Sequence, residues 1–254
     1  MILGKMQIPQ VATIQPSVDL LDGLISVWEL DESIGTVAYD SHGSNNGTIS
    51  GATINETGKL GKAYSFDGSN LGDKVNIGDV FAITDDMTIA CWVNMASLVK
   101  TKNNRHCFFG KGIEWYNNYN NSVEYFLSFY SEAGKFRFTV GNSYRIDACY
   151  SRANLWSAGT WYHVIGTYKK STDVLSLYVD TVLEEGKSHI AENGYGIPNL
   201  SHPITIGAST IINNEGKYYM DGLIDQCAIW SKCLNSDERS ALYNSGNGLA
   251  YQNW

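Results

Sequence analysis

The residues best suited to chemistry are carboxylates and amides in loops between apolar segments. Asp40 opens a loop rich in glycine and asparagine that runs to residue 48, and Asn46 lies within it. Carboxylate, amide and backbone carbonyl oxygens are the ligands that Ca²⁺ takes, about six to eight at a time, so this loop is a candidate calcium site. The alternative is that Asp40, and Asp67 at the end of another apolar segment, cap the backbone of their own turns.

A second group of candidates lies in residues 111–122, where aromatic rings alternate with asparagines. Trp115, Tyr116 and Tyr119 offer ring faces that stack on sugars or pack against a protein partner. The run of residues 144–156 is similar, and Arg145 within it is suited to grip a carboxylate. Loops on a rigid scaffold often carry function. Three interpretations stay open for 111–122: a glycan site, a protein-partner site, or a loop that packs only on its own sheet.

Signatures of catalysis are missing from the sequence. Glu29, Asp31 and Glu32 come nearest to the Glu-x-Asp-x-x-Glu pattern of a glucanase, which needs two carboxylates flanking the bond, but Ile34 occupies the last position. No Gly-x-Ser-x-Gly, His-Glu-x-x-His or phosphate-binding loop occurs. We therefore expect no enzymatic activity, with a glycan-cleaving enzyme as one alternative.

Composition narrows the class of protein further. Hydrophobic residues make up 43% of the 254 residues and charged residues 17%, which is typical of a globular chain. The formal net charge of −8 disfavours binding to the phosphate backbone, so we expect no nucleic-acid partner. The odd number of cysteines, five, disfavours a fully paired secreted scaffold.

Targeting signals are also missing. No segment has the basic start and apolar run of a signal peptide, and none is apolar over the roughly 20 residues that cross a bilayer. We expect no membrane insertion. The predicted location is a virion, a cell surface or a particle assembled in the cytoplasm, or the extracellular space if a signal was removed.

The elements that must position these residues are predicted to be strands. Short segments with period-2 alternation recur along the chain, with Gly/Asn/Asp turns between them, which is typical of a sandwich or barrel. Residues 40–61 are expected to form one long loop. The expected strands cover residues 24–30, 62–67, 74–77, 87–95, 123–130, 135–140, 161–168, 174–179, 204–207 and 219–230.

One helix is expected, near the carboxyl end. Asn235 caps its start, Glu238 completes a capping box, and Gly246 ends it. Residues 1–22 are interpreted as an arm or attachment segment, and residues 23–254 as one domain.

Read in order, these segments resemble the concanavalin A-like, laminin-G-like jelly-roll family. The resemblance covers about residues 23–246 and rests on order and spacing. Its segments are GLISVWEL at 23–30, the Asp40 loop, GKLGKAYSFDG at 58–68, WYHVIGTY at 161–168, LYVD at 177–180 and MDGLID at 220–225. Thr181 departs from the family pattern, which has glycine after Asp180.

The resemblance implies an all-β fold: a two-sheet antiparallel jelly-roll sandwich with one short carboxyl-terminal helix. It also implies that the loops of Asp40, Asn46, Asp67 and Asp225 meet at one edge, where many members bind a structural calcium ion. Large apolar residues are expected in the core between the sheets, namely Trp28, Phe66, Trp92, Trp161, Ile224 and Trp230.

These expectations point to a binding module with a structural calcium ion that recognises a carbohydrate or a protein surface, with a homo-oligomer or larger assembly also open. The first alternative is a structural, decoration or fibre protein of a bacteriophage virion.

Overall fold

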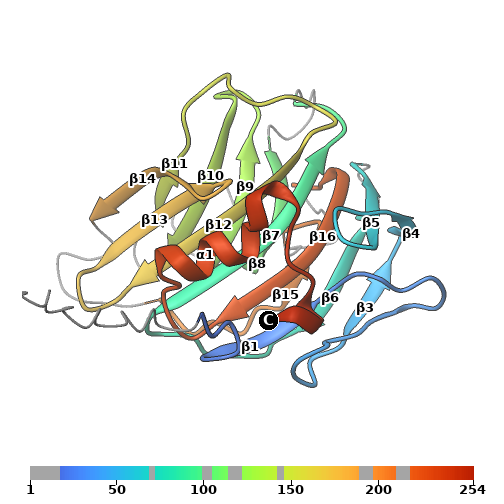
Figure 1. The fold of residues 1–254 in the computed structure, drawn as a ribbon, viewed down its shortest axis with the longest axis horizontal. Coiled ribbons are helices and arrows are strands. Elements are labelled where there is room, and N and C mark those ends of the chain that lie inside the picture. The colour runs from blue at the N-terminus through green and yellow to red at the C-terminus, as the bar shows by residue number, and fades with distance from the viewer. Residues whose placement is uncertain are drawn as a thin grey trace, which may run out of the picture.

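The computed structural model describes residues 18–68, 72–98, 105–113, 122–141, 146–188, 197–209 and 218–254. Two antiparallel sheets face each other, and a short helix, α1 (Ser236–Tyr243), lies on the outer side of one of them (Figure 1). The expected fold class, an all-β jelly-roll sandwich with one short carboxyl-terminal helix, is confirmed. Calcium candidates Asp40, Asn46, Asp67 and Asp225 lie in this part of the chain, whereas Trp115, Tyr116, Tyr119 and Arg145 lie outside it.

The sheet next to α1, sheet A, has the strand order β14-β13-β12-β7-β16-β5-β4, and β1 pairs with β16. In its central strands the side chains on both faces are buried, because both faces of this part of the sheet are covered. The strands are β1 (Leu24–Trp28), β4 (Thr53–Thr57), β5 (Lys62–Asp67), β7 (Met87–Met95), β12 (Trp161–Lys169), β13 (Val174–Val179), β14 (Val182–Ser188) and β16 (Asp221–Trp230).

The opposite sheet, sheet B, has the order β11-β10-β9-β8-β15-β6-β3-β2. Strand β10 shows the clearest alternation: Phe136, Phe138 and Val140 enter the core, and Arg137 and Thr139 lie on the other face. The strands are β2 (Val37–Ala38), β3 (Gly47–Ser50), β6 (Lys74–Gly78), β8 (Arg105–Ile113), β9 (Ser122–Tyr130), β10 (Lys135–Gly141), β11 (Ile146–Tyr150) and β15 (Ile204–Ile206).

Aromatic rings fill the space between the sheets. Trp28 of sheet A meets Phe109 of sheet B edge to face, with 5.7 Å between ring centroids. Phe138 of sheet B packs directly against Gly166 of sheet A, where a β-carbon would come within 2.3 Å of the phenyl ring. The two sheets therefore touch closely at this point.

Not every predicted core residue lies between the sheets. Trp92 and Trp230 are buried on the outer side of sheet A, where Trp92 stacks on Tyr243 at the end of α1. Trp230 belongs to a second apolar cluster with Leu20 and Leu242. Trp161 is only partly buried, because it starts β12 at the rim of the sandwich. The placement of these three tryptophans in the inter-sheet core was wrong.

The prediction of one long loop over residues 40–61 was also wrong. This segment contains β3 and β4. Strand β4 is a mostly exposed edge strand and β3 is half exposed, so neither has the apolar alternation that identifies a half-buried strand. Strands β2, β8, β11 and β14 were not predicted either.

The helix forms as its sequence indicates. Asn235 Oδ1 accepts the backbone N–H groups of Asp237 and Glu238, and the Glu238 side chain accepts the N–H of Asn235, so the capping box is confirmed. The helix ends at Asn244 in the left-handed conformation, two residues before the predicted Gly246. In the described parts of the chain, no helix is long and apolar enough to cross a membrane.

The departure from the family pattern at Thr181 lies in the two-residue turn between β13 and β14. Asp180 and Thr181 have φ values of 50° and 70°, the combination of a type I′ hairpin turn. Thr181 adopts the left-handed conformation although it is β-branched, which is a strained arrangement.

Candidate functional site

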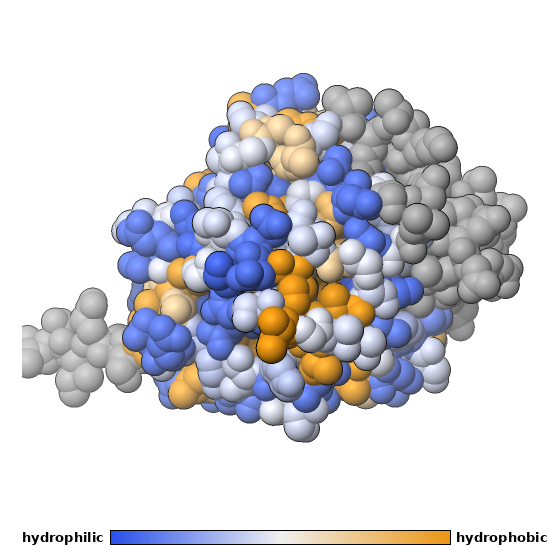
Figure 2. Space-filling model, turned by 90° about the vertical axis from the view of Figure 1, so that its right-hand side faces the viewer, coloured by the Kyte–Doolittle hydropathy of each residue, from blue (hydrophilic) through white to orange (hydrophobic). Residues whose placement is uncertain are grey.

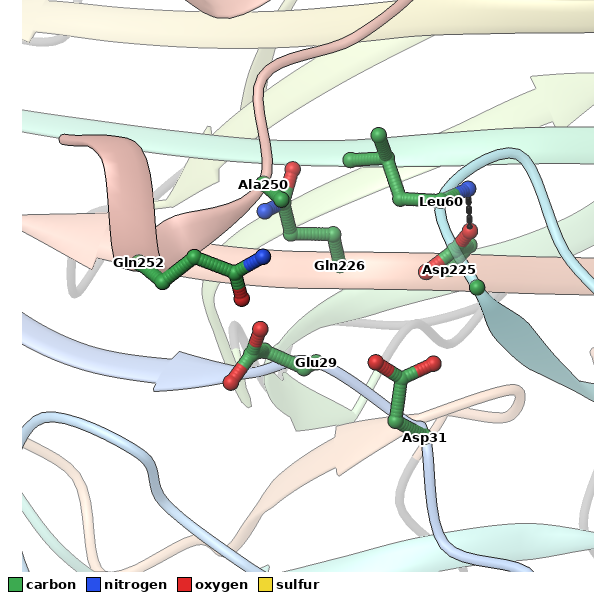
Figure 3. Close-up of a pocket in the computed structure, with 8 residues that line it drawn as sticks. Glu29, Asp31, Leu60, Asp225, Gln226, Ala250 and Gln252 are labelled. Atoms are coloured by element: carbon green, nitrogen blue, oxygen red, sulfur yellow. Dashed lines mark hydrogen bonds between the residues drawn. The ribbon is translucent and has the colours of Figure 1, made fainter.

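An acidic pocket opens where the segment after β1 meets β16 and the carboxyl-terminal segment. It has a volume of about 140 Å³ and is lined by Glu29, Asp31, Leu60, Gly61, Asp225, Gln226, Ala250 and Gln252. Figure 3 shows the side chains of Glu29, Asp31 and Gln252 pointing into the same space as Asp225. Three carboxyl groups and two amides thus converge from segments far apart in the sequence.

Asp225 is the buried member of the pocket, with no exposed surface. Its Oδ2 accepts the N–H of Leu60 at 2.7 Å, whereas its Oδ1 is buried without a hydrogen-bond partner (Figure 3). Burial raises the pKa of Asp225 to about 8, aided by the charge of Asp31 and opposed by the backbone N–H groups of Leu60, Lys59 and Gln226. A buried acceptor with no donor is costly, so this oxygen is the strongest indication of a ligand in the pocket.

Asp31 already has a structural task. Its Oδ1 accepts the N–H of Lys62 at 2.5 Å, so Asp31 and Asp225 together hold the turn of residues 58–62. Within the described ranges, no group of three or more His, Cys, Asp or Glu side chains is close enough to hold a metal ion. A cation here would therefore need amide, carbonyl or water oxygens besides the two carboxylates, as Ca²⁺ accepts.

Asp40 and Asn46 lie together, but their oxygens bind the protein itself. Asp40 accepts the Ser26 hydroxyl at 2.7 Å and backbone N–H groups of Val27, Gly43 and Asn45 at 2.9–3.1 Å. Asn46 Oδ1 accepts the N–H of Asp40. Burial raises the pKa of Asp40, but these hydrogen bonds outweigh it and the net shift is downward. The carboxylate acts as a turn cap, the alternative left open by the sequence.

Asp67 lies elsewhere again. Asp73 Oδ2 accepts the N–H of Asp67 at 3.1 Å, and Asp67 is directly opposite Asp221 in the pairing of β5 with β16. Since Asp225 is four residues further along β16, roughly 13 Å separates the two positions along the strand. The structure brings Asp40 to Asn46 but does not gather the four predicted calcium ligands into one cluster.

The predicted aromatic ligand site cannot be placed in the same way. Trp115, Tyr116, Tyr119 and Arg145 lie outside the described residues. Their role stays a prediction.

A second candidate site lies on the outer face of sheet B. Tyr130 of β9 stands directly opposite both Arg105 of β8 and Lys135 of β10, and Arg137 is opposite Tyr150 of β11. Cross-strand partners share a face, and the intervening Phe136 and Phe138 enter the core, so these five side chains lie on the outside. We call this group, with Tyr218, the cation–tyrosine face.

Cations and rings interleave on the cation–tyrosine face. The Arg105 guanidinium lies 5.1 Å from the Tyr130 ring and 5.0 Å from the Tyr218 ring. Arg137 lies 5.7 Å from the Tyr150 ring, and Lys135 lies 5.9 Å from it. These are cation–π distances. The arrangement holds the arginines against aromatic walls and leaves Tyr130, Tyr150 and Lys135 only half-buried at its open side.

The surface seen from the β3–β5 side of the molecule mixes hydrophilic and hydrophobic residues, with a hydrophobic group near its centre and others elsewhere on the face (Figure 2). Large exposed apolar patches usually mark protein or membrane contacts.

Comparison with known proteins supports the fold assignment. A family model described as the concanavalin A-like lectin/glucanases superfamily, of the laminin-G type, matches residues 67–238. The chain belongs to this superfamily. No curated protein sequence matches it.

Solved structures similar to this member of the superfamily come from enzymes and from toxin binding domains. Trypanosoma rangeli sialidase in complex with sialic acid has a TM-score of 0.65 and 17% identity, over 90% of this chain and 34% of that one. The ligand-binding domain of botulinum neurotoxin serotype D, in complex with N-acetylneuraminic acid, has a TM-score of 0.63 and 14% identity, over 88% of this chain and 51% of that one. A botulinum neurotoxin DC binding domain in complex with rat synaptotagmin II scores 0.63 at 15% identity. The chain thus spans about a third of the sialidases and half of the toxin domains.

The expectation of no enzymatic activity is contradicted by these matches. Sialidases, including a mutant displaying trans-sialidase activity, contain the same fold. The missing glucanase signature excludes one catalytic arrangement on the sandwich itself, but it does not exclude enzymes whose chains include such a sandwich. At 17% identity the likeness shows the fold alone, so it assigns no activity to this chain.

Sequence reasoning missed the residues of the cation–tyrosine face and the pocket residues Glu29 and Asp31. The sequence of β10 did contain a signal for this face. Arg137 lies between two phenylalanines whose side chains enter the core, so its own side chain points outward. Pairing partners such as Tyr130 and Tyr150 depend on strand register, which the sequence does not specify. Glu29 and Asp31 were considered only as a failed catalytic signature.

Proposed function

We propose that the chain is a binding module that recognises glycan through the cation–tyrosine face of sheet B. The observation that carries the proposal is the alternation of Tyr130, Tyr150 and Tyr218 with cationic side chains on one sheet face. Tyrosine rings offer a flat apolar surface to the C–H face of a sugar. The sialic acid complex of a toxin domain of the same fold supports a glycan as the ligand.

Glycan binding is tested on a glycan array and then by titration calorimetry of the best ligand. Tyr130→Ala and Tyr150→Ala should each weaken binding roughly 2- to 10-fold, since one aromatic contact is worth about 0.5–1.5 kcal/mol. Tyr39→Ala is the matched control, because Tyr39 is an exposed tyrosine outside this face. Failure to bind any glycan, or equal losses in all three variants, would contradict the proposal.

We also propose that calcium binds in the acidic pocket, with Asp225 and Asp31 as ligands and Glu29 beside them. The orphaned Oδ1 of Asp225 supports this, and the saturated oxygens of Asp40 make Asp40 a poor ligand. A bound ion would pin the turn of residues 58–62 to β16 and supply the missing partner to the buried carboxylate.

Calcium binding is tested by thermal unfolding with calcium chloride and with chelator. Saturating calcium should raise Tm by roughly 5 °C or more, because an ion that binds only the folded chain stabilises it. Asp225→Asn should abolish the shift, and Asp22→Asn, which alters an exposed carboxylate that pairs with Lys232 and does not line the pocket, should leave it intact. An unchanged Tm in the unmodified protein would remove the calcium proposal. The bacteriophage virion alternative and the predicted location stay predictions.

A further inference from the structure

Two cysteines meet in the core of the sandwich, on neighbouring strands of sheet A. Cys91 lies in β7 and Cys227 in β16, two strands that run side by side (Figure 1), and both side chains are fully buried between the sheets. The strands pair antiparallel on either side of the cysteines, through Asp225 with Trp92 and then from Ala228 onward. The two cysteines are therefore cross-strand neighbours, although they are far apart in the sequence.

A β-bulge in β16 brings the two thiols to the same side of the sheet. The register shifts between Asp225 and Ala228, so that Gln226 and Cys227 together oppose the single residue Cys91, and Gln226 has a φ of 42°. Simple alternation after Asp225, which faces the acidic pocket, would turn Cys227 away from the core. The extra residue turns it inward, beside Cys91.

The thiols of Cys91 and Cys227 contact each other. Burial, together with the hydrogen bond between the two thiols, raises the pKa of Cys227 well above its ordinary value. Two other cysteines donate to backbone carbonyls instead: Cys149 Sγ to a carbonyl of β13 at 3.4 Å, and Cys233 Sγ to one of β12 at 3.0 Å. Antiparallel neighbours have Cα atoms about 4.5–5.5 Å apart, within the roughly 4.4–6.8 Å that a disulfide spans.

We propose that Cys91 and Cys227 form a disulfide bond that joins β7 to β16 when the chain folds in an oxidising environment. The reaction is thiol–disulfide exchange with a small disulfide such as oxidised glutathione. One cysteine thiolate attacks a glutathione sulfur and releases the first glutathione. The second cysteine then attacks the protein sulfur of this mixed disulfide and releases the second glutathione. The protein loses two electrons and two protons, and the two glutathione thiols carry them away.

The bond forms during folding and not in the folded protein. Both sulfurs are fully buried, and a raised pKa leaves little of the reactive thiolate. The same burial protects the bond from reductants once the sheets have closed. One pair among five cysteines also accounts for the odd number, with Cys107, Cys149 and Cys233 left as thiols.

Peptide mapping tests the pairing directly, because trypsin places each cysteine on a different peptide. Reduced protein is unfolded in urea and refolded either with reduced and oxidised glutathione or with reductant alone, and free thiols are then blocked with iodoacetamide under denaturing conditions. After refolding with glutathione, residues 75–100 and 218–232 should appear as one disulfide-linked peptide. Residues 106–111, 146–152 and 233–239 should carry the blocking group. Refolding with reductant should leave all five cysteines blocked.

Stability provides a second measurement. The protein refolded with glutathione should have a Tm roughly 5–10 °C above that of the reduced protein, since the bond restricts a long loop of the unfolded chain. Cys227→Ala should remove both the linked peptide and this difference. Cys233→Ala is the matched control, because it removes a partly buried thiol from the next tryptic peptide and should leave both intact.

Three results would overturn the proposal: five blocked cysteines after refolding with glutathione, a link between any other two peptides, or a link that leaves Tm unchanged or lowers it. The peptide map of the unmodified protein needs no variant, so it holds even if Cys227→Ala fails to fold. Neither glycan nor calcium enters the experiment, and its outcome is therefore independent of the proposed function.

Discussion

The carboxylate of Asp40, in a glycine-rich loop, is engaged in hydrogen bonds from the surrounding backbone. Asp40→Ala would leave the Ser26 hydroxyl and the N–H groups of Val27, Gly43 and Asn45 without an acceptor. Each buried, unsatisfied group costs about 1–3 kcal/mol, and partial rehydration limits the sum. We expect a loss of about 3 kcal/mol in the free energy of unfolding, measured by urea denaturation.

The control for this variant is Asp22→Ala, which breaks an exposed ion pair with Lys232. It should change the same free energy by less than about 1 kcal/mol. The lowered pKa of Asp40 adds a pH signature: its stabilisation is present above the unfolded pKa and is lost as the pH falls through the lower folded value. Similar losses in the two variants would contradict the capping role.

His163 also makes the protein less stable as the pH falls, but through burial of its neutral ring. It lies on the outer side of sheet A, stacked on Trp92 at 4.8 Å, and burial lowers its pKa to about 3. Its unfolded pKa is near 6.5, so the unfolded chain binds the proton first and stability falls as the pH drops from about 6.5 towards 3. At pH 5 the histidine alone should cost about 2 kcal/mol relative to pH 8.

Comparison with His163→Phe isolates this contribution. The variant keeps a stacked ring without a titratable nitrogen, so its stability should fall less between pH 6.5 and pH 5, measured by urea denaturation at each pH. Parallel pH profiles of the two proteins would show that His163 is not responsible.

At the scale of elements, the β13–β14 hairpin is closed by a residue that does not favour its conformation. Thr181 has φ of 70°, where glycine is preferred. Thr181→Gly should raise the free energy of unfolding by about 1 kcal/mol. Removing the strained non-glycine residue gains about 1–3 kcal/mol. The greater conformational entropy of glycine in the unfolded chain offsets part of this gain.

The matched control is Thr181→Ala, which retains the β-carbon that causes the strain and should therefore bring no comparable gain. Tm measured by calorimetry reports both variants. If the alanine variant gained as much as the glycine variant, loss of the threonine side chain and not backbone strain would be the cause.

Most strands with a strong apolar pattern were predicted, whereas the edge strands β2, β4, β11 and β14 and the interior strands β3 and β8 were not. The bounds of β5, β7 and β13 match the prediction. The alternation of β5 and β13 reflects a core on one side, and β7 is an apolar strand buried on both faces. Strand β4 is mostly exposed and β3 is half exposed. Both are held in their sheets by backbone hydrogen bonds, which any sequence can make. The candidate sites were harder still, since the acidic pocket and the cation–tyrosine face join residues through strand register and not through sequence spacing.

At the scale of the whole molecule, the sandwich depends on how closely its sheets approach. The ring of Phe138 in β10 packs against Gly166 of β12, and a β-carbon at Gly166 would lie 2.3 Å from Cδ2 of that ring. Real contacts cannot be so short, so Gly166→Ala must push the sheets apart or move the phenyl ring. We expect a loss of about 1–3 kcal/mol in the free energy of unfolding, the usual cost of overpacking a core.

A double-mutant cycle decides whether this one contact sets the sheet spacing. Phe138→Leu alone opens a gap and should destabilise the protein, but in Gly166→Ala it removes the clash. The double variant should therefore be more stable than the sum of the two single losses predicts, by about 1 kcal/mol or more, as residues in contact couple. Strictly additive losses would mean that the clash is absorbed elsewhere. A coupled result would show that the contact between one glycine on sheet A and one phenylalanine on sheet B limits how closely the two layers approach.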